Sequence, residues 1–127
     1  MNPITVESKD VNSSVPSEFS EDVSVSSRLV TNEAKFRLKE FNLKILSALE
    51  NLDDVKFLDA YINLTNKFSK KIDDCLFIEN RQDLDMIISA IKSSESLLKQ
   101  GIDDGDEETI EVAWDGLYLI ITHTYLV

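Results

Sequence analysis

Residue types that build most catalytic and metal sites are scarce in this sequence. Among its 127 residues there is one cysteine, Cys75, and one histidine, His123. A single cysteine excludes an internal disulfide bond and a zinc site that uses several cysteines. The three glycines, Gly101, Gly105 and Gly116, are too few for a phosphate-binding or dinucleotide-binding loop. We therefore expect a protein that is not an enzyme and that uses no metal ion or cofactor.

The two scarce side chains have ordinary structural interpretations. Cys75 continues an apolar stripe, so we expect a small buried hydrophobic residue. His123 lies between two threonines in an apolar tail, which favours a structural or surface role over catalysis. The acidic stretch "DDGDEE" does not match a calcium loop, because a loop that starts at Asp103 would have Trp114 where the final glutamate is required.

Long apolar runs and positive charge are also lacking. No run of 18 uncharged apolar residues occurs, and the N-terminus lacks the basic and apolar regions of a secretory signal. These absences predict a soluble, cytoplasmic protein without membrane contact. The net charge of −11 repels nucleic acid phosphates, so we expect no direct nucleic acid binding. It suits a basic protein partner, or simply solubility.

The negative charge is unevenly distributed along the chain. Residues 1–30 carry a net charge of −3, residues 31–101 carry −1, and residues 102–127 carry −7 with no lysine or arginine. An acidic block of this kind is typical of an interaction surface, although it also serves as a solubilising face.

The first 28 residues differ in composition from the rest. They contain eight serines and both prolines of the chain, with Phe19 as their only aromatic residue. Such a segment buries too little apolar surface to offset the entropy of ordering it, which predicts a flexible arm. The piece "DVSVSS" alternates valine with polar residues and could add a short strand to a partner. The serine-rich composition also resembles that of bacterial type III export signals.

Residues 29–127 have the periodicity of helices. Apolar residues recur at steps of three and four in stretches that we expect to begin near Thr31, Asp53 and Asn80. Asn80 is a good N-cap, and Gly101 stands where a helix would end. The three apolar faces are Ala34, Leu38, Phe41, Ile45 and Leu49; Leu58, Tyr61, Thr65, Phe68, Ile72 and Cys75; and Leu84, Ile87, Ile91, Ser94 and Leu98. The fold class predicted is all-α, a three- to four-helix bundle with a flexible Ser-rich N-terminal arm.

The last segment, "GIDDGDEETIEVAWDGLYLIITHTYLV", leaves two alternatives open for residues 117–127. Their β-branched and aromatic content suits a strand, whereas the acids before them suit a helix N-terminus, and the spacing of Ile110, Ala113, Leu117 and Ile120 suits a helical core face. We favour the helix. Beyond Gly116 it is apolar on all sides, which predicts burial on all sides.

On such a helix the acids form a ridge beside an aromatic stripe. Three uses of the stripe remain open: bundle core, dimer seam, or anchor for a partner. We predict a small acidic inhibitor or immunity-type protein that engages a basic protein, such as a nuclease or toxin. The alternative is a secretion-associated chaperone or structural subunit whose N-terminal arm is an export or docking segment. The partner-binding residues expected are Asp104, Glu107, Glu108, Glu111, Trp114, Asp115, Tyr118 and Tyr125.

Overall fold

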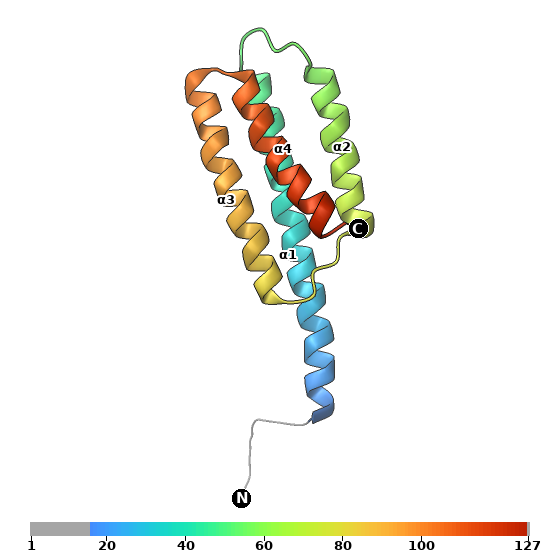
Figure 1. Cartoon of the computed structure of the whole chain (residues 1–127). Coiled ribbons are helices and arrows are strands. Elements are labelled where there is room, and N and C mark those ends of the chain that lie inside the picture. The colour runs from blue at the N-terminus through green and yellow to red at the C-terminus, as the bar shows by residue number, and fades with distance from the viewer. Residues whose placement is uncertain (1–15, 127) are drawn as a thin grey trace, which may run out of the picture.

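The protein folds as a bundle of four helices (Figure 1). The structure, a computed structural model, describes the backbone of residues 16–126 and the side chains of residues 26–126. The helices are α1 (Pro16–Glu50), α2 (Leu58–Cys75), α3 (Arg81–Asp104) and α4 (Glu107–Thr124). The described part of the chain contains no strand, so the prediction of an all-α bundle is confirmed, and residues 117–124 are helical.

Helix α1 is the central member of the bundle. It packs against each of the other three helices, and α2 and α3 lie on either side of it (Figure 1). Helices α1 and α3 run in one direction, and α2 and α4 run in the other (Figure 1). The most extensive helix pair is α3 with α4, whereas the backbones of α2 and α4 stay farther apart and meet through the rings of Phe68 and Tyr118. No helix in the described residues is both long and apolar enough to span a membrane.

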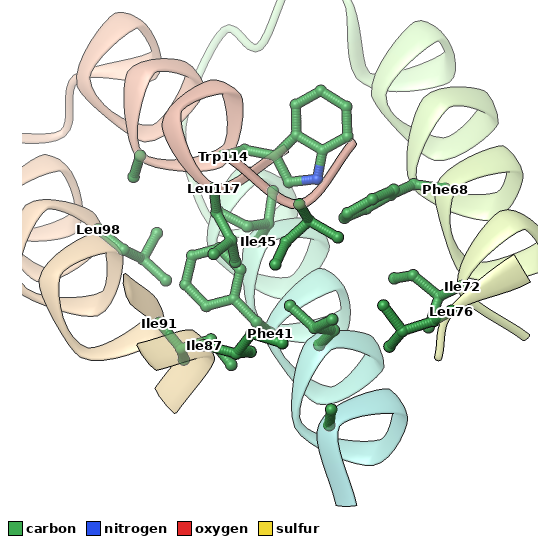
Figure 2. Close-up of a cluster of buried hydrophobic side chains, with 14 of the residues drawn as sticks. Phe41, Ile45, Phe68, Ile72, Leu76, Ile87, Ile91, Leu98, Trp114 and Leu117 are labelled. Atoms are coloured by element: carbon green, nitrogen blue, oxygen red, sulfur yellow. The ribbon is translucent and has the colours of Figure 1, made fainter. Parts of the chain in front are cut away.

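The predicted apolar faces form the core, with one error on α2. All five residues expected on the first face are buried, together with most of the second and third faces (Figure 2). Cys75 is exposed, however, so the prediction that it is a buried hydrophobic residue was wrong. The reason is that α2 ends at Cys75 and the backbone at Leu76 is extended. Leu76 and Ile78 of the following connection fill the core at that level instead.

Helix α1 begins earlier than the sequence indicated. Its first residue is Pro16, because proline fits the first turn of a helix where its missing N–H is not needed. Residues 22–27 are therefore helical, and the short strand that they could add to a partner stays a prediction. Residues 1–15 of the predicted arm lie outside the described residues. A role of that arm as an export or docking segment stays a prediction.

Thr31 lies inside α1 and holds the connection between α2 and α3. Its hydroxyl accepts a hydrogen bond from Ile78 N at 2.8 Å and donates one to Ile78 O at 3.1 Å. Four residues earlier, the Ser27 hydroxyl donates to Glu79 O at 2.7 Å. The two side chains satisfy backbone groups of the connection, so Thr31 makes a tertiary contact from inside α1 and does not mark the start of the helix.

The helix ends match the sequence at one place and differ at two. Asn80 is the N-cap of α3, and its side chain accepts a hydrogen bond from Asp83 N at 3.0 Å. Helix α2 starts at Leu58 and not at Asp53. Helix α3 continues past Gly101 and ends at Gly105, whose φ of 62° is the left-handed conformation that glycine adopts without strain.

Gly101 serves close packing instead of a helix end. A Cβ atom at this position would lie 2.8 Å from Ile110 Cγ1 and 3.0 Å from Ile110 N. Only glycine lets the last turn of α3 approach the first turn of α4 so closely. This contact fixes where α4 starts, and with it the position of the acidic residues.

Candidate functional site: the groove between α2 and α4

The open side of the bundle is a groove between α2 and α4. The rings of Phe68 and Tyr118 meet between these two helices, and Leu64, Lys67 and Lys71 beside them remain exposed. Two depressions of about 320 Å³ each lie along this side. We define the α2–α4 groove by the residues that line them: Lys56, Phe57, Tyr61, Leu64, Lys67, Phe68 and Lys71 from α2 and the loop before it, and Asp106, Glu107, Glu108, Glu111 and Tyr118 from α4 and its N-cap.

The first depression is acidic because α4 begins there. Asp106 is the N-cap of α4, and its carboxylate accepts hydrogen bonds from Glu108 N at 3.1 Å and from the Thr109 hydroxyl at 2.7 Å. Glu107 Oε1 accepts a hydrogen bond from Lys56 N at 3.2 Å. Glu107 Oε2 is buried and has no hydrogen-bond partner within the described chain. One carboxylate oxygen at this end therefore has unused capacity to accept a hydrogen bond.

The electrostatics of this depression appear in the pKa of Tyr61. Burial, followed by the negative charges of Glu111, Glu107 and Asp115, raises the pKa of the Tyr61 phenol to about 12. Burial also raises the pKa of Asp115. The part of the Tyr61 pKa shift that comes from Glu111, Glu107 and Asp115 shows that carboxylate charges act on this depression.

Each depression also has an apolar side chain, Phe57 in the first and Leu64 in the second. Phe57 and Leu64 are exposed, with 62% and 45% of their surface accessible. Below them an aromatic cluster forms the floor. The Phe68 and Tyr118 rings meet edge to face at 5.0 Å, and Trp114 stacks on Tyr118 at 4.9 Å. Figure 2 shows Phe68 and Trp114 facing each other across the space between the two helices.

The opposite end of the groove is basic. Lys67 and Lys71 line the second depression together with Leu64 and Tyr118, and both lysines are exposed. The groove therefore changes from carboxylates at the start of α4, through apolar side chains, to ammonium groups near the end of α2. This order gives the groove a direction.

Trp114, which we predicted from the sequence to bind a partner, is part of the core. Only 4% of its surface is exposed. Its indole Nε1 donates a hydrogen bond to Asn42 Oδ1 at 3.1 Å, and Asn42 Nδ2 donates to Ser69 Oγ at 2.9 Å. This chain of hydrogen bonds joins α4, α1 and α2 through the bundle. Of the three uses left open for the aromatic stripe, Trp114 belongs to the core.

The other predicted residues fall into two groups. Glu107, Glu108, Glu111 and Tyr118 line the groove, and Asp115 contributes to its field. Asp104 and Tyr125 do not line it. Asp104 is the exposed last residue of α3, and Tyr125 packs against the core after the end of α4. Burial, and then the charge of Asp83, raises the Tyr125 pKa.

The apolar end of α4 is not buried on all sides, contrary to the sequence-based expectation. Leu119 and Ile120 are about half exposed, at 52% and 48%, while Ile121 is fully buried. The helix has one face on the core and lies at the edge of the bundle, so side chains between its contact faces remain in solvent.

The groove residues of α2 were missed by sequence reasoning. Phe57, Leu64 and Lys71 recur every seven residues, which places them on one line along α2 beside its core face. That spacing was a usable signal.

The groove is lined by carboxylates, ammonium groups and apolar side chains. No three histidine, cysteine, aspartate or glutamate side chains among the described residues converge to hold a metal ion. Comparison with protein-family models, curated protein sequences and solved structures finds no match to this chain. Function is therefore inferred from the side chains of the groove.

Proposed function

We propose that this protein is a protein-binding module of the inhibitor or immunity type, which engages a basic partner such as a nuclease or toxin through the α2–α4 groove. One observation carries the proposal. The carboxylates of Asp106, Glu107, Glu108 and Glu111 surround a depression beside the exposed ring of Phe57. An exposed aromatic ring next to carboxylates is the combination that receives an arginine or lysine side chain.

The acidic end would supply both speed and strength of binding. Seven acids without a base in residues 102–127 attract a basic partner over distance and raise the association rate. At contact, the exposed carboxylates of Asp106 and Glu108 would accept hydrogen bonds from the partner's cation. The negative charges of Glu111, Glu107 and Asp115, which add to burial in raising the pKa of Tyr61, would also attract that cation.

The rest of the groove would select the segment that follows the cation. Phe57 and Leu64 favour apolar side chains, because covering them removes their exposed area from water. Lys67 and Lys71 favour a carboxylate at the far end. We expect a segment that presents a cation, then apolar side chains, then an acid.

Other modes of contact are less suited to these residues. The acidic surface opposes direct binding to nucleic acids and to anionic membranes. A dimer seam on the aromatic stripe of α4 loses its main anchor, because Trp114 is buried within its own chain. As part of the same proposal, we place the protein in the cytoplasm.

Selection from a random peptide library displayed on phage tests the proposal. The immobilised full-length chain should enrich peptides with arginine or lysine near apolar residues. Their binding should weaken as salt is raised, because screening reduces the attraction between charges. The variant Glu107→Lys/Glu108→Lys/Glu111→Lys should lose these peptides.

A matched variant controls for net charge alone. Glu50→Lys/Asp53→Lys/Glu79→Lys makes the same change in charge at exposed residues outside the groove. It should retain most of the binding. If both variants lose the peptides equally, only overall charge matters, and the groove is not the binding site.

A further inference from the structure

Three exposed apolar side chains form a line along the outer face of α1. Leu29, Phe36 and Leu43 are 61%, 64% and 68% accessible. Each is seven residues from the next, so the three lie almost directly above one another on the helix. The opposite face of α1 carries the buried core residues, and α2, α3 and α4 all pack on α1 without covering this line. We call Leu29, Phe36 and Leu43 the α1 ridge.

Charged residues border the α1 ridge in a pattern that is complementary to itself. Arg28 and Lys35 directly precede the first two ridge residues, and Glu33 and Glu40 follow those ridge residues by four positions. In a parallel pair of helices that meet through such a heptad, the residue just before a ridge position lies opposite a residue of the other helix. That residue has a sequence number higher by five. Arg28 would therefore face Glu33 of the second copy, and Lys35 would face its Glu40.

The opposite orientation is disfavoured by the same charges. In an antiparallel pair, the residues that precede the ridge positions face each other, and so do those that follow. Bases would then meet bases and acids would meet acids. We infer that the α1 ridge is a self-association surface, through which two copies of this chain pair with their α1 helices parallel and in register.

Nearby residues indicate a weak, reversible dimer. The other seam positions are Asn32, Lys39 and Leu46, and only Leu46 is apolar. Lys39 Nζ is directed to Asp73 at 2.8 Å, which turns its charge toward α2. A polar residue in a helical seam lowers stability but fixes the register.

Glu33 and Lys35 already make contacts within their own chain, and replacing these by contacts to a second copy would cost little free energy. Glu33 pairs with Arg37 at 3.0 Å, and Lys35 Nζ donates to Asp73 O at 2.9 Å. Exposed pairs of this kind contribute little to stability, so they do not prevent pairing with a second copy. Phe77, 62% exposed, shares a depression with Arg28 and Lys35 and widens the apolar area beside the ridge.

This inference is independent of the proposed function. Helix α4 packs on the core face of α1, and none of the three ridge residues lines the α2–α4 groove. Analytical ultracentrifugation of the full chain over a range of concentrations tests it first. We expect a reversible monomer–dimer equilibrium. A chain that remains monomeric at the highest concentration overturns the inference, and leaves the ridge to a different partner.

Two variants separate the ridge from other apolar surface. Phe36→Glu should abolish the dimer and leave the melting temperature nearly unchanged, because Phe36 contributes mostly exposed surface. Leu64→Glu, which changes an exposed apolar residue in the groove, should leave the dimer intact. Glu33→Lys/Glu40→Lys should raise the dimer dissociation constant about tenfold or more, because like charges then meet across the seam. A dimer that survives Phe36→Glu contradicts the assignment.

Cysteine cross-linking determines the orientation. In a Cys75→Ser background, Leu29→Cys, Phe36→Cys and Leu43→Cys are each exposed to a mild oxidant. A parallel, in-register pair brings each position next to its own copy, so all three variants should form disulfide-linked dimers. Cross-linking of Phe36→Cys alone, with Leu29→Cys joining only to Leu43→Cys in a mixture, would show an antiparallel pair and contradict the inference.

Discussion

The two sides of α4 are built in opposite ways. On one side α4 closes against α3, where Gly101 lets the helix backbones approach until Ile110 fills the space that a side chain would need. On the other side α4 faces α2, where bulky aromatic rings and charged residues keep the two helices apart. The comparison shows that side-chain size at the facing position decides whether a helix pair becomes a seam or a groove.

The same contrast places the acidic residues. The close approach at Gly101 and the turn at Gly105 set where α4 starts. Asp106, Glu107 and Glu108 therefore occupy the first turn of α4 at the open side of the bundle, next to the loop before α2. The close packing of α4 against α3 therefore determines where the acidic residues lie in the α2–α4 groove.

The largest expected effect is the loss of the aromatic floor beneath the groove. Trp114→Ala should lower the free energy of unfolding by about 3–5 kcal/mol, because it removes a buried ring and leaves a cavity. Asn42 would also lose its hydrogen-bond donor. Urea denaturation measures the change. Leu119→Ala, at a half-exposed position of the same helix, should cost less than about 1 kcal/mol. Equal costs for both would mean that Trp114 is not a core residue.

A single added methyl group should disrupt the close contact between α3 and α4. Gly101→Ala should destabilise by about 1–3 kcal/mol, because the new Cβ would meet Ile110 below contact distance. Gly116→Ala is the matched control. Nothing lies within 4 Å of its added Cβ, so alanine should stabilise α4 by about 0.5–1 kcal/mol. Thermal denaturation of the two variants should show shifts of opposite sign, and shifts of the same sign would contradict the close contact.

The acidic end of the groove should be sensitive to alkaline pH. Tyr61 has a pKa of about 12 in the folded chain, against an ordinary value of 10.0, so the unfolded chain releases this proton first. Stability from this group is complete below pH 10 and is lost as the pH rises through 12, with a loss of about 1 kcal/mol at pH 11. Tyr61→Phe should remove this part of the pH dependence. If the free energy of unfolding falls with pH equally steeply in Tyr61→Phe, other groups cause the alkaline loss of stability.

The smallest expected change in stability comes from the acids themselves. Glu108→Lys should change the free energy of unfolding by only about 0.5 kcal/mol or less, because Glu108 is exposed. A lysine in the first turn of α4 opposes the helix dipole, so we expect the change to be a small loss of stability. Urea denaturation at low and high salt measures the effect. A cost of several kcal/mol would place Glu108 in a structural role.

The fold could be predicted from the sequence because core periodicity is local. The steps of three and four that include Phe41, Ile45 and Ile91 determine which face of each helix is buried, whatever lies opposite. Cys75 and Gly101 were misinterpreted because their environments depend on distant residues. The connection at Leu76 ends α2, and Ile110 occupies the space beside Gly101.

The candidate site was predicted in part for the same reason. The acids of α4 are visible as a block, and four of the eight expected residues line the groove. Trp114 could not be assigned from periodicity, because its burial depends on Asn42, 72 residues away. The contribution of Phe57, Leu64 and Lys71 required knowing that α2 and α4 lie side by side.

Backbone amide NMR spectra of the labelled chain test the groove most directly. A basic peptide recovered from the library selection is titrated into the full-length protein, and the shifted signals are mapped on the helices. We expect the shifts to concentrate in residues 56–71 and 106–118, and to be absent in the Glu107→Lys/Glu108→Lys/Glu111→Lys variant. Shifts confined to α3 or to the α1 ridge, with the groove signals unchanged, would contradict the assignment of the α2–α4 groove as the binding surface.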